Sequence, residues 1–178
     1  MRNIKVKQLI VKGNIEDYYI LEMLKPVNSF AKKSMNINTM PWVEVKYCIK
    51  HLRTVESWGT VKDIYELCFK VTEKEFFNAR IVEFYQSRKY LLKAFEDVII
   101  KESKLLSSTS TDGHLWKQAG GDKLNIFSDT LPLIQLGKEF GIYPYDLGKK
   151  PYSEVLSLLV QSKRQNEVEA EYQKLKYK

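Results

Sequence analysis

Apolar residues recur three and four positions apart over most of this chain, and that spacing places side chains on one face of an α-helix. Between residues 41 and 53 it joins Trp42, Val45, Ile49 and Leu52. The same spacing runs through residues 61–69 and along a stretch that ends near Leu106. The pattern therefore predicts a mainly α fold, a multi-helix bundle of roughly five to seven helices.

The start of the chain has a different pattern. Ile4-Lys5-Val6-Lys7 alternates apolar and charged residues, and apolar residues continue to Val11, before Gly13. Such alternation favours a half-buried strand, and lysines are typical of a sheet edge. We expect a short N-terminal strand here, then a helix over residues 16–24 capped by Asn14, and a loop or hinge over residues 27–40.

Polar and glycine residues mark where the later elements begin and end. Thr72 and Glu75 have the spacing of a capping box, which predicts a helix start after Thr72 and a long helical stretch to about Leu106; a break near Asn78 is left open. Pro132 suits the first turn of a helix that ends at Gly141. A compact apolar loop follows over residues 142–148.

A serine- and threonine-rich segment, SSTSTDG at residues 107–113, is the clearest linker, since small polar side chains do not anchor to a core. We expect three parts: an N-terminal strand plus helical body over residues 1–106, a linker over 107–114, and a C-terminal helical module over 115–178. The last helix opens at Pro151 and keeps its apolar face to Val160. Beyond that point only Val168, Tyr172 and Leu175 keep a helical spacing, so the order of residues 161–178 is left open.

Composition narrows the class of protein. The chain has 178 residues, of which 44% are apolar and 12% aromatic, so it can bury a core and is not wholly disordered. With only two cysteines, the chain cannot be a disulfide scaffold. With only two histidines, a His-rich metal centre is not expected. No apolar run reaches the length of about 18 residues that a membrane span needs. Lysines alternate with the apolar residues at the N-terminus, whereas a secretory signal peptide has an uninterrupted apolar segment. We expect a soluble protein of a reducing, cytoplasmic environment.

The residues that could carry chemistry have simpler explanations. Gly120-Gly121-Asp122-Lys123 is too short for a phosphate-binding loop. Cys48 and His51 lie on one helical turn, but Cys48 is next to the apolar stripe of that helix. A structural role is therefore favoured for the Cys48 thiol, and likewise for the thiol of Cys68. His114 stands beside Trp116 without a second histidine or a paired carboxylate. The carboxylate runs at 73–75, 96–97 and 167–171 are explained by capping or by solvated helix faces. We therefore expect no enzyme, no metal site and no cofactor.

The formal charge of +7 raises the question of nucleic acid. Lys and Arg residues bind phosphates when they gather on one face. Here they are spread along the chain, and the C-terminal ones alternate with glutamates. A solvated basic surface is therefore favoured over a DNA or RNA binder.

Aromatic residues are the remaining signal. Three Trp, eleven Tyr and eight Phe exceed what a chain of this length needs. For the tryptophans core packing is the favoured interpretation. Tyr143 and Tyr145 are flanked by turn residues, so for them a core position and a contact surface are both open.

The final third contains four short motifs: Trp116-Lys-Gln-Ala-Gly-Gly, Lys138-Glu139-Phe140-Gly141, Ile142-Tyr-Pro-Tyr-Asp-Leu-Gly and Pro151-Tyr-Ser-Glu-Val-Leu. Through them residues 116–160 resemble small tail-assembly proteins of tailed bacteriophages, of the tail assembly chaperone type. In that group a helix ending in Glu-Phe/Tyr-Gly precedes a short apolar loop with a proline and then a second helix. This chain has more basic than acidic residues, whereas such chaperones are expected to be acidic. A structural protein of the virion therefore remains an alternative.

The resemblance implies a non-enzymatic factor of virion morphogenesis in the host cell cytoplasm. Its partners would be phage tail proteins of the tape-measure or tube type, bound through apolar helix contacts; self-association is left open and no membrane partner is expected. Two alternatives remain: a structural neck or tail subunit, located in the virion, and a small basic nucleic-acid-binding accessory protein. The resemblance assigns either the contact or the fold of the contact module to seven residues: Leu136, Phe140, Tyr143, Tyr145, Leu147, Tyr152 and Leu156.

Overall fold

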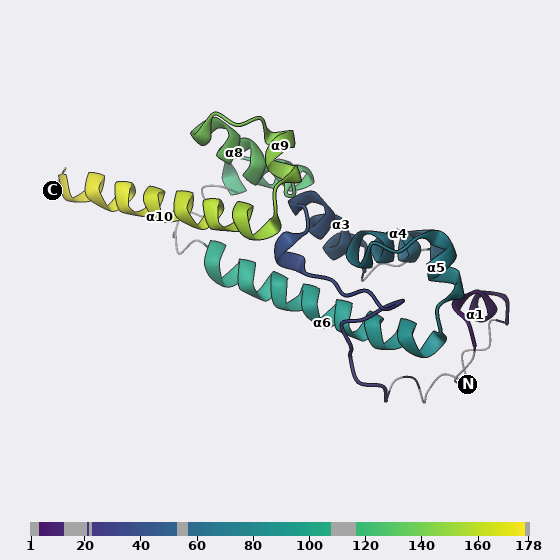
Figure 1. Cartoon of the computed structure of the whole chain (residues 1–178). Coiled ribbons are helices and arrows are strands. Elements are labelled where there is room, and N and C mark those ends of the chain that lie inside the picture. The colour runs from purple at the N-terminus through teal and green to yellow at the C-terminus, as the bar shows by residue number, and fades with distance from the viewer. Residues whose placement is uncertain (1–3, 13–20, 22, 53–56, 108–116, 177–178) are drawn as a thin grey trace. The chain divides into compact units, whose positions relative to one another are not determined.

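The computed structural model describes residues 4–12, 21, 23–52, 57–107 and 117–176 (Figure 1). Within these ranges it contains eight α-helices, two short 3-10 helices and no strand. The expectation of a mainly α, multi-helix fold is confirmed, and the eight α-helices exceed the five to seven expected.

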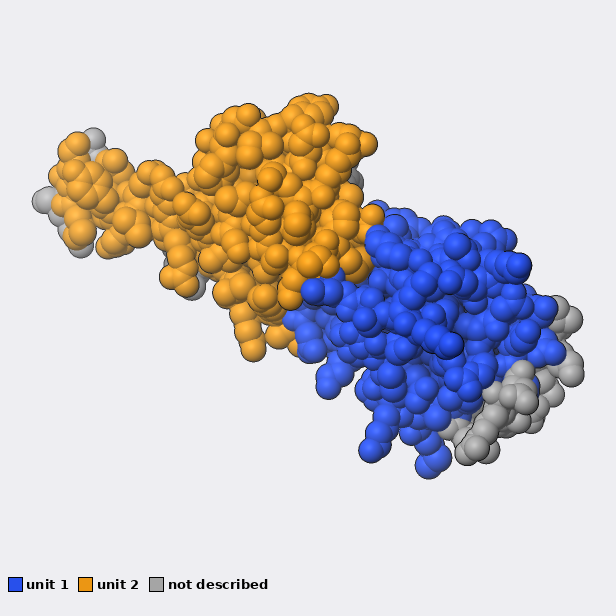
Figure 2. All heavy atoms as spheres, in the orientation of Figure 1, with its two compact units in different colours: residues 1–37, 47–98 blue, residues 38–46, 99–178 orange. Residues whose placement is uncertain are grey.

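The chain divides into two compact units, which Figure 2 colours separately. Unit 1 comprises residues 1–37 and 47–98, and unit 2 comprises residues 38–46 and 99–178. Two helices, α3 (Trp42–Leu52) and α6 (Ile81–Leu106), therefore contribute residues to both units. The linker expected at 107–114 lies outside the described residues apart from Ser107, so that boundary stays a prediction.

Unit 1 is built around a cluster of buried aromatic rings. It contains α1 (Val6–Lys12), α4 (Trp58–Phe69), α5 (Glu73–Asn78) and most of α6. The ring of Phe30 packs edge-on against Tyr65 with centroids 4.5 Å apart, and Phe69 and Phe76 also pack against Phe30. The Tyr65 hydroxyl donates a hydrogen bond of 2.9 Å to the carbonyl of Phe84, so its buried oxygen is satisfied.

The capping box expected at the start of α5 is present. The Glu75 backbone N–H donates to the Thr72 hydroxyl, and the Thr72 backbone N–H donates to the Glu75 carboxylate at 2.7 Å. Lys33 adds an ion pair to that carboxylate at 2.9 Å. The Thr72 backbone N–H, together with Lys33 and the Thr72 hydroxyl, lowers the pKa of Glu75 to about 2. The break left open near Asn78 is confirmed, because α5 ends at that residue.

The N-terminal strand was a wrong expectation. Val6–Lys12 form helix α1, and Lys5 makes only an isolated antiparallel bridge to Arg80. Val6 and Leu9 are three residues apart and both buried, a pairing that a helix achieves and a strand, with its period of two, does not. The helix expected over residues 16–24 lies mostly outside the described residues, and the expected loop over 27–40 contains the 3-10 helix η2 (Ile37–Thr39).

Unit 2 joins the start of α3 to the C-terminal helices. These are the 3-10 helix η3 (Gly121–Phe127), α8 (Leu131–Phe140), α9 (Pro144–Lys149) and α10 (Tyr152–Lys176). The rings of Trp42 and Tyr152 stack with centroids 5.5 Å apart, and the Tyr152 backbone N–H donates to the carbonyl of Met40 at 2.7 Å. The last helix thus continues well past Val160, where the apolar face recognised in the sequence ended.

Candidate protein-interaction surface

A tight turn fixes helices α8 and α9 against each other. Gly141 ends α8 in the left-handed conformation, φ 67°, as expected. The Ile142 backbone N–H donates to the Gly137 carbonyl at 3.1 Å. A Cβ atom at Gly137 would lie 2.6 Å from the Ile142 carbonyl oxygen, so the close approach of the two helices requires glycine at this position. The turn is therefore held by a backbone hydrogen bond and by the close approach of Gly137 to the residues that follow it.

The segment expected as an apolar loop over residues 142–148 contains the short helix α9 instead. Tyr143 is its N-cap and Pro144 its first residue, where the fixed φ of proline suits a helix. A helix of six residues, fewer than two turns, is too short to show a period of 3.6 in the sequence, which explains the wrong expectation. Leu147 projects from α9 into the core of unit 2 and is fully buried.

Three aromatic side chains of this helix pair are exposed. Tyr143 is 70% exposed and Tyr145 64%, and Phe140 on the last turn of α8 is partly exposed. We call these three residues the α8–α9 aromatic surface. The Lys149 ammonium group lies 4.1 Å from the centre of the Tyr145 ring, close enough for a cation–π contact. The surface therefore combines apolar area with hydroxyl groups and a positive charge.

The structure divides the seven residues that the phage resemblance singled out. Four of them are buried in unit 2 and hold its core: Leu136, Leu147, Tyr152 and Leu156. The other three form the α8–α9 aromatic surface. For Tyr143 and Tyr145, where the sequence left core and surface open, the side chains lie outside the core.

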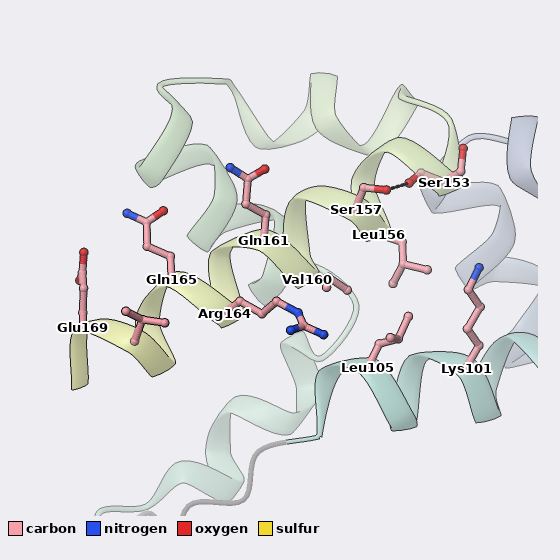
Figure 3. A pocket seen from close by; sticks show the side chains of 11 residues that line it. Lys101, Leu105, Ser153, Leu156, Ser157, Val160, Gln161, Arg164, Gln165 and Glu169 are labelled. Atoms are coloured by element: carbon pink, nitrogen blue, oxygen red, sulfur yellow. Dashed lines mark hydrogen bonds between the residues drawn. The ribbon is translucent and has the colours of Figure 1, made fainter. Parts of the chain in front are cut away.

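A groove follows α10 where α6 ends, with a volume of about 900 Å³. Figure 3 shows Leu105 of α6 and Leu156 of α10 pointing into it from its two sides. The Lys163 ammonium group ties the helices together by donating to the carbonyls of Leu105 and Ser107. Sequence reasoning missed the groove because its walls are some 50 residues apart in the chain, and no local pattern links them.

The C-terminal part of α10 carries three exposed apolar residues. Val168, which lines the end of the groove, is 69% exposed, Tyr172 is 60% and Leu175 is 63%. We call them the C-terminal stripe. This part of α10 extends past α8 and α9 in Figure 1. Exposed apolar side chains that lie together on one helix face are candidates for an interaction site.

Three of the four cysteines and histidines considered for chemistry lie in the described part of the chain. Cys48 and Cys68 are buried, with their sulfur atoms 3.8 Å apart, and the His51 ring packs against Tyr47 at 4.6 Å. His114 and Trp116 lie outside the described residues. In the described ranges no group of three or more His, Cys, Asp and Glu side chains could hold a metal ion.

Two exposed surfaces, both in unit 2, are thus the candidates for function. Across the part of the chain that is described, no helix has the length and apolarity to cross a membrane. No family model, curated protein or solved structure matches the chain.

Proposed function

We propose that this chain is a non-enzymatic protein-binding factor of bacteriophage morphogenesis, of the tail-assembly chaperone type. It binds tail proteins of the tape-measure or tube type through the α8–α9 aromatic surface. The observation that carries the proposal is the presentation of Tyr143 and Tyr145, both largely exposed, on a turn fixed by the contacts of Gly137. The bacteriophage assignment rests on the resemblance of residues 116–160 and on nothing else.

Rigid exposed tyrosines favour protein binding for two reasons. Tyrosine buries a large area and offers a hydroxyl at a low cost in side-chain entropy, so it is enriched among residues that dominate binding energy. A turn that is already ordered does not lose further freedom when the partner binds. Leu136 and Leu147 anchor the two helices beneath this surface, because both are buried in the core of unit 2.

The test is co-expression of the tagged chain with each tail-tube and tape-measure candidate encoded by its genomic neighbours. Capture is then measured for the wild type and for the double variant Tyr143→Ser/Tyr145→Ser. We expect the double variant to weaken capture about tenfold or more, since each tyrosine of a hot spot contributes over 1 kcal/mol. The helical circular dichroism should stay unchanged. Ile100→Ser, an exposed apolar residue of α6, is the matched control and should leave capture intact.

The result also separates the alternatives. Capture that persists at high salt supports apolar recognition, whereas recovery of nucleic acid alone, lost as salt rises, would replace the proposal with the nucleic-acid alternative. Firm retention of the chain in purified particles would identify a structural neck or tail subunit. Capture that is equal for wild type and double variant would remove the α8–α9 aromatic surface from the proposal.

A further inference from the structure

The two halves of α10 direct their apolar residues to opposite sides of the helix. At about 100° of rotation per residue, the mean direction of Tyr152, Val155 and Leu156 lies about 180° from that of the C-terminal stripe. The first three are buried in unit 2, and the stripe is exposed. Because all three stripe residues are exposed, the rest of unit 2 leaves the stripe uncovered.

The stripe has the spacing of a coiled-coil seam. Val168 and Tyr172 are four residues apart, and Tyr172 and Leu175 are three apart, which are the intervals between d, a and d positions of a heptad. The same frame places Gln165 at the preceding a position and Gln161 at the preceding d position. We propose that residues 161–176 of α10 pair with the same residues of a second copy of this chain in a parallel, in-register coiled coil.

The charges that flank the seam favour this partner. In the frame above, Arg164 and Glu171 occupy g positions and Glu169 and Lys176 occupy e positions. In a parallel coiled coil a g residue lies opposite the e residue five positions later in the other chain. Arg164 then faces Glu169 of the second copy, and Glu171 faces Lys176 of the second copy. Both pairings join opposite charges, and two-fold symmetry forms each of them twice.

The Arg164 and Glu169 side chains are available for this pairing. Residues five apart on one helix do not face each other, so these two cannot pair within a chain. In the described ranges neither takes part in an ion pair, whereas their neighbours Lys163 and Glu167 pair within the helix at 3.3 Å. Both Arg164 and Glu169 line the groove, and Figure 3 shows both side chains projecting from α10.

An antiparallel pair can place apolar residues opposite apolar residues, or opposite charges facing each other, but no single antiparallel register does both. The register that brings Arg164 opposite Glu171 sets Val168 against Gln165 and Tyr172 against Gln161. The register that sets Val168 against Tyr172 brings Glu169 opposite Glu169 and Glu171 opposite Glu171. Only the parallel register matches Val168, Tyr172 and Leu175 with themselves while also pairing opposite charges.

The test is sedimentation equilibrium of the full-length chain over a wide range of concentration at low salt. We expect a monomer–dimer equilibrium for the wild type, and a dissociation constant raised roughly tenfold by Arg164→Glu, which reverses two symmetric pairs. The charge swap Arg164→Glu/Glu169→Arg should restore the wild-type constant. Asn166→Glu, at a b position outside the seam, is the matched control and should leave dimerisation unchanged. A monomer at every concentration, or a dimer insensitive to Arg164→Glu, would overturn the proposal.

A disulfide test fixes the orientation. Gln161→Cys at a d position should oxidise to a covalent dimer, because each residue of a parallel in-register pair faces its own copy; the native Cys48 and Cys68 are buried. In an antiparallel pair, Glu171→Arg would rescue dimerisation of the Arg164→Glu variant and Glu169→Arg would not. The Gln161→Cys variant would then form no covalent dimer. These two results together would overturn the proposal. The Tyr143→Ser/Tyr145→Ser variant should remain dimeric, so the failure of partner capture and the failure of dimerisation are distinguishable.

Discussion

The two units use their aromatic residues in opposite ways. Unit 1 gathers Phe30, Tyr65, Phe69 and Phe76 into one buried cluster. Unit 2 buries the stacked pair Trp42 and Tyr152 but exposes aromatic side chains on η3, on α8 and α9, and on α10. Among the described residues, the aromatic side chains that are largely exposed all belong to unit 2.

This difference separates residues that hold a fold from residues that offer a contact. A buried aromatic ring contributes its transfer free energy and its packing contacts to folding. An exposed ring held on a rigid turn contributes little to folding and keeps its area for a partner. Composition alone does not distinguish these positions, because Phe30 is buried and Phe140, the same residue type, is partly exposed. Substitutions in each unit test whether the distinction is correct.

The largest effect on stability is expected for Phe30→Ala in unit 1. Phe30 is fully buried and packs on three other aromatic rings, so its truncation leaves a cavity that helical neighbours cannot close. We expect a loss of about 3–5 kcal/mol in the free energy of unfolding. Urea denaturation followed by far-ultraviolet circular dichroism measures it, and hydrogen exchange of residues 61–76 should rise.

Phe140→Ala in unit 2 is the matched control for Phe30→Ala. It removes the same atoms from a partly exposed position at the end of α8, and the expected loss is below about 1 kcal/mol. Equal losses for the two variants would contradict the distinction between a structural and a contact role.

A smaller effect is expected for Gly137→Ala, which tests the rigidity of the α8–α9 turn. The added Cβ would meet the Ile142 carbonyl oxygen at 2.6 Å and the Pro144 ring at 3.1 Å, so the two helices must separate. We expect a loss of about 1–3 kcal/mol by overpacking, and faster hydrogen exchange in residues 131–149. Gly59→Ala is the control, since a Cβ atom there meets its nearest neighbour at 3.5 Å. Unchanged exchange in the Gly137→Ala variant would mean that the turn is not rigid.

The sequence predicted correctly those features that depend on a few neighbouring residues. The capping box of Thr72 and Glu75 and the helix stop at Gly141 each depend on a few adjacent residues, and both are present in the structure. The spacing of Trp42, Val45 and Leu52 likewise predicted α3, because a helix with one buried face repeats its apolar residues along the chain.

Features that depend on distant residues could not be predicted in this way. Leu9 of α1 belongs to a buried cluster with Leu21 and Ile81, so tertiary packing overrides the strand-like alternation of the first residues. The candidate surface was located only in part, because the spacing of Leu136 and Phe140 does not tell which of them faces the core. The sequence also did not predict that the two halves of α10 direct their apolar residues to opposite sides. Periodicity gives the spacing of apolar residues, but it does not tell which other residues cover them.

The smallest expected effect is a dependence of unit 1 on acid pH. The pKa of Glu75 falls from the ordinary value of 4.5 to about 2, chiefly because the Thr72 backbone N–H bonds to the charged carboxylate, with Lys33 as the second contribution. A carboxyl group whose pKa is lower in the folded state stabilises that state fully above its unfolded pKa, and the contribution disappears as pH falls through the folded pKa. Glu75→Gln should therefore destabilise the chain above about pH 4.5, and its difference from the wild type should shrink between pH 4.5 and 2. Urea denaturation at a series of pH values measures this difference, with Glu73→Gln on the same helix as the control. A difference that is constant down to pH 2 would show that the charge of Glu75 does not support the capping box, and that the cap depends on hydrogen-bond geometry alone.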